Sequence, residues 1–419
     1  DLDLRDLATA DEDRFFTELN EIFSDPLFRQ LDLPKQELRD LAELCPGVTH
    51  ALQRLYAAYA EARRGETLAA AQIAGRDSTL AFEGNPIERV RDLIEANRNY
   101  FPELDQSAEA LRDELNVPHQ ELMPALAERL RERHSASVRI MPVDVMRETL
   151  RRWDRHRRQI LISELVDMPG RAFQLAYYIG TSEHGPAMDA IVSRGGPLDD
   201  VSRRLYRITL ANYFAAAVLM PYTPFHSAAE ALGYDIGVLS LRFNASFEQV
   251  CHRLTTLQRP AARGVPFFML RVDNAGNVSK RFSSGTFPFS KFGGTCPLWN
   301  VHATFDTPGR LLSQIIEMPD GHRYFSLAQT VKRPVAPHPQ PMPRYAIGLG
   351  CELRYASRLV YAAGFDLDKG EATPIGVNCR LCERENCTQR AEPPLARTLI
   401  LDENTRRVSS FSFSSAREL

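Results

Sequence analysis

The chain has 419 residues, of which 44% are hydrophobic and 25% are charged. This is an ordinary globular composition that excludes wholesale disorder, and at roughly 150 residues per domain it predicts two to three domains. The 51 lysines and arginines against 54 aspartates and glutamates give a net charge of −3, which excludes a chain that is basic throughout, as nucleic-acid binders are.

Residues 1–135 are predicted to form a helical region that acts as a linker or dimerisation element. Leu52, Leu55, Tyr56 and Tyr59 have the spacing of one helix face. Residues 105–115 and 118–133 repeat this pattern, and the Gly, Pro and Asn content of 75–86 predicts a loop. A plain helical subdomain explains the same pattern equally well. The chain starts at Asp1 without an apolar leader, so we expect a cytoplasmic protein that lacks part of its N-terminus.

Residues 136–260 are predicted to form an α+β unit. Residues 136–143 and 159–165 have strand character, and a charged helix is expected between them. The arginines at 151–158 are interpreted as the solvated face of that helix, with phosphate binding as the alternative. Amphipathic helices follow at 171–181 and 201–221.

Parts of this unit resemble the zinc metallopeptidase domain of the family that cleaves phage and stress repressors. The resemblance is carried by FQLAYYIGT at 173–181 and by ANYFAAAVLMP at 211–221. In that family two His ligands and a Glu base share the first helix, whereas here Tyr177, Tyr178 and Thr181 take their places. A zinc site needs imidazole, thiolate or carboxylate ligands, so we expect a degenerate scaffold. His184 and His226 are isolated and are interpreted as structural.

Residues 261–344 change to the period of strands. PFFMLRVD, the turn NAGN and VSKRFSS predict a hairpin, and FSLAQTV predicts a further strand. This part is therefore expected to be an α+β domain. Residues 333–344 contain five prolines and are predicted to be an extended connector.

Residues 345–419 form a cysteine-rich segment and tail. Cys379, Cys382 and Cys387 lie within nine residues, and Cys351 can supply a fourth thiolate, with Cys296 as an alternate. Four thiolates suit either Zn²⁺ or an iron–sulfur cluster, and the spacing alone slightly favours zinc. Free buried cysteines are the structural alternative. Cys45 and Cys251 lie in helical patterns and are assigned to the core.

The succession ANYFAAAVLMPY, GVPFFMLRVDNAGNVSKRFSS, FGGTCPLWNVH, QIIEMPDGHRY, IGLGCELRYASRLVY and IGVNCRLCERENC closely resembles the short-chain fatty acyl-CoA regulators. The resemblance covers about residues 100–395. These bacterial transcription factors of propionate and methylcitrate metabolism carry an N-terminal helix-turn-helix domain. The resemblance implies an effector module that binds CoA or a short acyl-CoA, and a [4Fe-4S] cluster on Cys351, Cys379, Cys382 and Cys387 in place of zinc.

A CoA ligand needs cations for its phosphates and an apolar slot for its acyl end. Lys280, Arg281 and Lys291 are the candidate phosphate contacts, and Trp299, Phe289 and Tyr178 are candidates to line the apolar slot. The alternative is that the basic residues are ordinary surface positions of strands.

Two functions follow from these observations. The first is the sensor part of a homo-oligomeric transcriptional regulator that is not an enzyme and reaches DNA through a domain absent from this chain. The second is an acyl-CoA- or peptide-processing enzyme with a structural zinc, although no nucleophile–His–acid set is legible. No stretch reaches 18 consecutive apolar residues, so no membrane partner is expected.

Overall fold

The computed structural model describes residues 34–45, 47–56, 86–289, 294–331, 342–394 and 397–413, with isolated positions at 19, 22, 23 and 59. The chain divides into two compact units, Asp1–Gly84 and Asn85–Leu419. In the first unit, α2 (Lys35–Leu44) and residues 47–56 are helical, as the spacing of Leu52 and Leu55 predicts. The predicted loop at 75–85 and most of the proline-rich connector lie outside the described residues.

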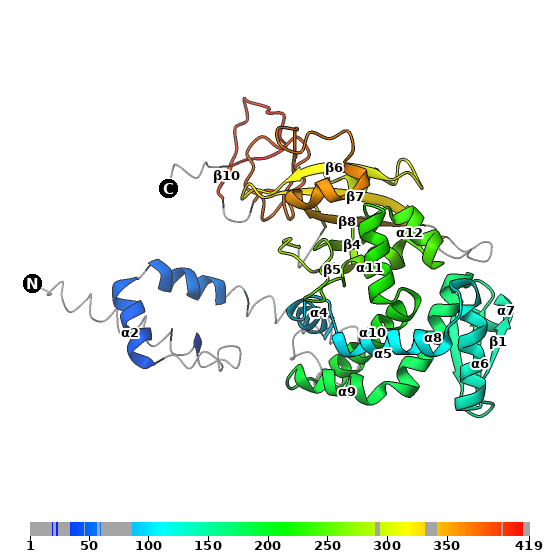
Figure 1. Ribbon diagram of the computed structural model, residues 1–419. Coiled ribbons are helices and arrows are strands. Elements are labelled where there is room, and N and C mark those ends of the chain that lie inside the picture. The colour runs from blue at the N-terminus through cyan, green and yellow to red at the C-terminus, as the bar shows by residue number, and fades with distance from the viewer. Residues whose placement is uncertain are drawn as a thin grey trace, which may run out of the picture. The chain divides into compact units, whose positions relative to one another are not determined.

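The second unit begins with helices that pack on one long central helix, α10 (Asp200–Leu219) (Figure 1). Eleven residues of α10 are buried, because its C-terminal half is apolar on almost all sides and helices surround it. The helices that pack on it are α4 (Pro86–Ala96), α5 (Pro102–Leu115), α8 (Met168–Glu183) and α9 (Gly185–Arg194). Between α5 and α8 lie η3 (His119–Glu121) and α6 (Leu122–His134), and α6 packs on α8. Asp167 and Asp199 cap the N-termini of α8 and α10 with their carboxylates.

The helix predicted between the first two strands is wrong. Only one helical turn, α7 (Val143–Met146), is present, and a hairpin follows it. The central strand pairs with both neighbours in the order β1-β3-β2, and the strands are β1 (Ser137–Met141), β2 (Arg151–Asp154) and β3 (Gln159–Ser163). Trp153 lies opposite Ile160 and packs on the core, so strand pairing overrides the helical tendency of this arginine-rich run.

Three short helices connect this part to the second sheet. They are α11 (Tyr222–Ala231), α12 (Ile236–Phe243) and α13 (Phe247–Leu254). Ser246 and Gln249 form a reciprocal capping box that starts α13. This box fixes the orientation of the helix that carries Glu248 and His252.

The second sheet has six strands in the order β5-β4-β8-β7-β6-β9. All pairs are antiparallel except β6 with β9, and the predicted hairpin is confirmed as β4 and β5. The strands are β4 (Phe268–Asp273), β5 (Val278–Ser283), β6 (Leu312–Glu317), β7 (Arg323–Val331), β8 (Tyr345–Glu352) and β9 (Thr373–Pro374). The expectation of a mixed α+β protein is therefore confirmed.

The two faces of this sheet are buried in different cores. Successive side chains alternate between faces, so Met269 and Phe325 join the core shared with the helices, while Phe268 and Tyr324 join a second core. The second core also holds Trp299, beside the short α14 (Asn300–Ala303).

Beyond β8 the chain is mainly loops. Besides β9, its regular elements are η4 (Leu353–Arg358), η5 (Val360–Ala362) and a two-stranded ladder of β10 (Leu399–Ile400) with β11 (Ser412–Phe413). Ile375 and Val377 pack on the second core, which places the cysteine loop on that side of the sheet. Across the described parts of the chain, no helix has the length and apolar character needed to cross a membrane.

Candidate functional site

The position that a zinc ion would occupy in a peptidase is filled by a stack of side chains. The guanidinium of Arg151 lies 3.8 Å from the ring centre of Tyr177 and 5.2 Å from that of Tyr178. Trp153 packs on Tyr178 with ring centres 5.8 Å apart. A cation held over tyrosines at the former ligand positions disfavours a bound metal ion, so the stack stabilises this scaffold in place of zinc.

The two isolated histidines are structural in the way the sequence predicts. His184 packs on Phe214 with ring centres 4.7 Å apart, and burial lowers its pKa. His226 stacks on Tyr222. Aromatic packing thus accounts for both of these imidazoles.

A cavity of about 790 Å³ lies between the degenerate peptidase helices and the large sheet. This volume is in the range of small-molecule sites, roughly 300–1,000 Å³. The lining residues come from α8, α10, α13, β4, β5, β7 and nearby loops: Leu150, Val166, Asp167, Gly170, Phe173, Gln174, Thr209, Asn212, Ala216, Ser246, Phe247, Glu248, Gln249, His252, Met269, Lys280, Phe282, Gly309, Gln329, Thr330 and Val331.

The cavity carries little net charge and many amides. Among the described residues that line it, Lys280 is the single lysine or arginine, against the carboxylates of Asp167 and Glu248. The Nζ of Lys280 lies 2.7 Å from Oε1 of Glu248, which also lies 2.9 Å from a guanidinium nitrogen of Arg271. Four side-chain amides also line the cavity, from Gln174, Asn212, Gln249 and Gln329. Such a surface suits a ligand portion that bears amides and no charge.

His252 is a neutral member of this lining. Its ring lies 4.4 Å from the ring of Phe282. Desolvation, reinforced by the charge of Lys280, lowers its pKa to about 3. The cavity therefore gains no positive charge from this imidazole at neutral pH.

Of the predicted CoA contacts, the structure places Lys280 alone on this cavity. Arg281, the next residue on β5, points to the opposite face and pairs with Glu88 of α4. Trp299 is buried in the second core, where its Nε1 donates to Ser326 Oγ at 2.7 Å. Phe289 packs against the same core.

A further predicted contact, Tyr178, does not line the cavity either. Tyr178 belongs to the arginine–aromatic stack. Lys291 lies outside the described residues. The side-chain amides, in contrast, were missed because glutamines and asparagines that are far apart in sequence carry no motif.

The predicted set of four thiolates is not brought together. Cys351 is fully buried on β8 opposite Phe325, in the core shared with the helices. Cys296 is buried in the second core, on the side of the sheet where Ile375 and Val377 anchor the cysteine loop. Cys387 and Cys379 act electrostatically on Cys296, the alternate, and not on Cys351.

Cys296 responds to the surroundings of the cysteine loop. Burial raises the pKa of Cys296, and the neighbouring thiols of Cys387 and Cys379 raise it further. A Cβ added to Gly376 would lie 2.7 Å from Sγ of Cys382, so this glycine lets the backbone approach the thiol closely.

A buried cation accompanies the cysteine loop. Arg390 is 4% exposed and donates to the carbonyl oxygens of Cys379 and Cys382 at 3.1 and 2.9 Å. Its Nε is buried without a hydrogen-bond partner, and it forms no ion pair with a described residue. A thiolate-bound metal centre is negatively charged and matches this cation. Among the described side chains, no three potential ligands stand at metal-binding spacing, so binding requires the loop to close.

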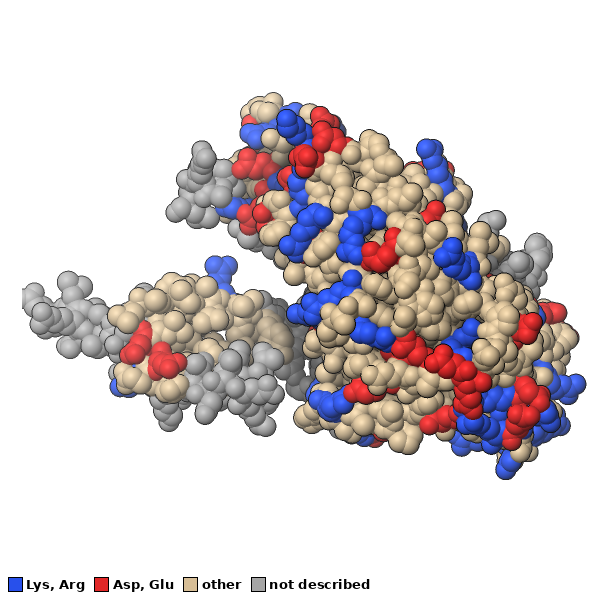
Figure 2. Space-filling model, viewed as in Figure 1, with Lys and Arg blue, Asp and Glu red and all other residues tan. Residues whose placement is uncertain are grey.

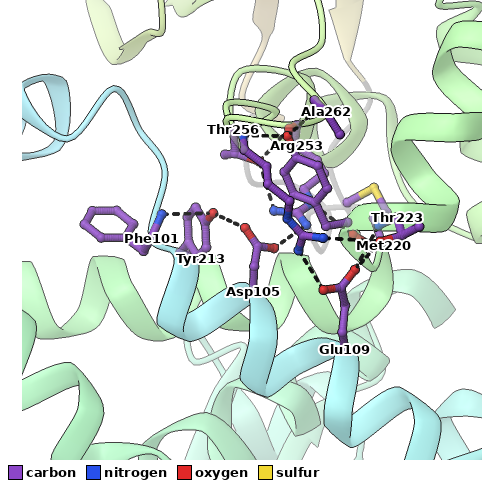
Figure 3. A network of polar contacts seen from close by, with 11 residues as sticks. Phe101, Asp105, Glu109, Tyr213, Met220, Thr223, Arg253, Thr256 and Ala262 are labelled. Carbon is purple, nitrogen blue, oxygen red and sulfur yellow. Dashed lines mark hydrogen bonds and ion pairs between the residues drawn. The ribbon is translucent and has the colours of Figure 1, made fainter.

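A buried polar network braces the helix that carries Glu248 and His252 (Figure 3). Arg253 donates to Asp105 on α5, to the Met220 carbonyl at 2.9 Å and to Thr256 at 2.9 Å. Tyr213 donates to the same aspartate at 2.6 Å, and burial raises the pKa of this phenol. The network ties α5, α10 and α13 together behind the cavity.

Two family descriptions match the chain. Residues 131–255 match the IrrE N-terminal-like domain of the M78 peptidases, and residues 256–411 match the C-terminal domain of the short-chain fatty acyl coenzyme A regulators. The first match agrees with the peptidase-like scaffold.

Relatives that match almost the whole of this chain are named as regulators. HTH-type transcriptional regulator RamB of Mycobacterium tuberculosis is 41% identical over 416 residues, which cover 96% of this chain and 85% of that protein. A propionyl-CoA carboxylase regulator of Cereibacter sphaeroides is 39% identical (97% of this chain, 85% of the relative), and PrpR of Mycobacterium tuberculosis is 38% identical (100% and 85%). A solved Mycobacterium tuberculosis transcriptional regulator shares 41% identity with a TM-score of 0.75 over 78% of this chain and 99% of that one.

Proposed function

Because the chain belongs to the short-chain fatty acyl-coenzyme A regulator family, whose members are transcriptional regulators and not enzymes, we propose that it binds CoA or a short acyl-CoA in the cavity between the peptidase-like helices and the sheet. The ligand would bias the arrangement of a homo-oligomer that acts on DNA. Two of the relatives are named HTH-type transcriptional regulators. This arrangement couples an effector to transcription without catalysis.

The charge and the amides of the cavity carry this proposal. Phosphates would be unfavourable between Asp167 and Glu248, whereas an acyl-pantetheine arm has amides and a thioester but no charge. The arm can exchange hydrogen bonds with Gln174, Asn212 and Gln329, and its acyl end can lie against Phe173 and Phe282. Lys280, whose side chain is 44% exposed, is then the residue that faces the phosphates.

Filling the cavity tests the proposal. Thr209 lines the cavity, while its neighbour Ile208 on α10 is 46% exposed and lies outside the lining. In calorimetric titrations with propionyl-CoA, Thr209→Phe should bind at least about tenfold more weakly than the wild type, a loss of about 1.4 kcal/mol. The matched variant Ile208→Phe should bind as the wild type does. Absence of binding by the wild type, or equal binding by Thr209→Phe, would refute the proposal.

We propose that the cysteine loop holds a [4Fe-4S] cluster, with zinc as the alternative, through Cys296, Cys379, Cys382 and Cys387. When bound, the centre would supply a rigid, negatively charged crosslink between the loop and the second core. The unpartnered Nε of Arg390 and the close approach at Gly376 support this choice of ligands.

A further inference from the structure

The surface of the three-stranded sheet carries arginines that the effector proposal does not use. Arg139 lies on β1, Arg152 on β2, and Arg155, Arg157 and Arg158 in the turn at 155–158, and all five are exposed. We call these five residues the arginine patch. In Figure 2, Lys and Arg side chains gather at the corner of the visible face where Figure 1 places β1 and α6, with acidic side chains among them.

The strand register places two of these arginines on one row. Arg139 and Arg152 both lie opposite Leu161 of the central strand, so all three project from the same face of the sheet. Val138, Ile160 and Trp153 form the next row and pack on the core. Arg139 and Arg152 are therefore about 10 Å apart on the solvent face, and their aliphatic stems can cover Leu161.

None of the five arginines forms an ion pair with a described residue. The only acid of the hairpin, Asp154, accepts hydrogen bonds from the backbone N–H groups of His156 and Arg157 at 3.1 Å each. Glu164, after the last strand, accepts from the N–H of Val143 at 2.8 Å.

The arginines of the neighbouring helix α6 behave differently. Arg129, Arg131 and Arg133 each pair with a glutamate. Those arginines are neutralised locally, whereas the arginine patch keeps its positive charge open to an external anion.

We propose that the arginine patch contacts the phosphate backbone of duplex DNA without reading its sequence. All five cations are arginines, whose planar fork binds phosphate oxygens in a bidentate way. Four of them lie on the β2–β3 hairpin and its turn, and Arg139 lies on the neighbouring strand β1. A two-stranded ribbon with its turn is a shape that reaches the backbone and grooves of a duplex. The relatives are transcriptional regulators, so DNA is the polyanion that a protein of this family meets. The surface is separate from the cavity, and this inference does not depend on effector binding.

The test is a titration of the full chain against a short fluorescent duplex of arbitrary sequence at several NaCl concentrations. In the variant R152Q/R155Q/R157Q/R158Q, the slope of log K against log salt should fall by up to about 4, because each phosphate contact contributes ~0.9. The control R131Q/R133Q/R203Q/R207Q removes the same charge from exposed, ion-paired arginines and should keep most of the slope. Circular dichroism should show both variants folded.

Three results of these titrations would overturn the inference. They are a wild type that does not bind the duplex at low salt, a patch variant with an unchanged slope, and a control that loses as much as the patch variant. Poly-glutamate that displaces the duplex at equal charge concentration would also overturn it, in favour of an acidic protein as the partner.

Discussion

Asp105 and Arg253 form an ion pair in which neither side chain is exposed, with Oδ1 2.5 Å from a guanidinium nitrogen. The two residues are 148 positions apart in sequence. The second aspartate oxygen accepts the hydroxyl of Tyr213 at 2.6 Å, so both charges are fully hydrogen-bonded. The pair joins α5 to α13, the helix that presents Glu248 and His252 to the cavity.

Asp105→Asn should destabilise the protein strongly. It leaves the guanidinium of Arg253 buried without a counter-charge, which costs about 3–5 kcal/mol. Urea unfolding measures this loss. As a matched control, Asp200→Asn breaks the exposed pair with Arg203 and should cost less than about 1 kcal/mol. Equal losses in the two variants would contradict a role for burial.

Arg151→Gln should weaken the stack that replaces the zinc site. The lost cation–π contacts with Tyr177 and Tyr178 are worth about 1 kcal/mol at a partly buried position. The emission of Trp153, which packs on Tyr178, should shift in the same variant. Arg152→Gln, one residue along on the solvent face, should change neither quantity, and a similar shift there would argue against the stack.

Stability should fall as the pH is lowered, in part through His252. Its folded pKa is about 3, below the unfolded value of about 6.5. Between these two pH values the imidazole is protonated in the unfolded chain and neutral in the folded chain. The contribution of His252 to the free energy of unfolding is therefore fully present above pH 6.5, and about 2 kcal/mol of it is lost at pH 5.

The variant His252→Gln isolates this contribution. Lys280, Glu248 and Arg253 are the charged groups that act on the imidazole, and His119, with a pKa of about 4, adds acid sensitivity of its own. The difference between wild type and variant in urea unfolding should therefore shrink from pH 7 to pH 5. A difference that does not depend on pH would contradict the assignment.

Glu248→Gln should increase affinity for CoA. Glu248 holds Lys280 at 2.7 Å and competes with a phosphate for it, so its neutralisation should tighten CoA binding about five- to tenfold, or roughly 1 kcal/mol. Pantetheine lacks phosphates and should bind both forms equally in calorimetry. A gain that is equal for the two ligands would point to a steric cause.

Cys296→Ser should abolish metal binding, whereas Cys351→Ser should leave it intact. The reason is that the large sheet separates Cys351 from the other thiols. Iron, sulfide and zinc contents of protein purified without oxygen measure the outcome. Retention of the metal by Cys296→Ser together with its loss in Cys351→Ser would restore the ligand set expected from the family resemblance.

Local sequence signals predict the elements but not which face a residue occupies. The turn NAGN and the alternation around it predict β4 and β5, and apolar spacing predicts α8 and α10. The run at 151–158 misleads because arginine favours helices, while Trp153 is held in a strand by its pairing with Ile160. That preference comes from tertiary packing.

The functional residues show the same limit. Lys280 and Arg281 are adjacent and equally basic, yet they lie on opposite faces of β5. Cys351 follows the buried run IGLG, and its place in that strand is the one local signal that it belongs to the core. The link between Asp105 and Arg253 has no signal in a single sequence.

Hydrogen–deuterium exchange of the full chain with and without propionyl-CoA tests the central claim most directly. If the cavity holds the ligand, backbone amides should gain protection at 166–174, 246–252, 278–282 and 329–331, the segments that line it. Protection elsewhere, for instance at the cleft formed by Glu109, Arg112, His119 and Thr223, or no protection at saturating ligand, would contradict the claim.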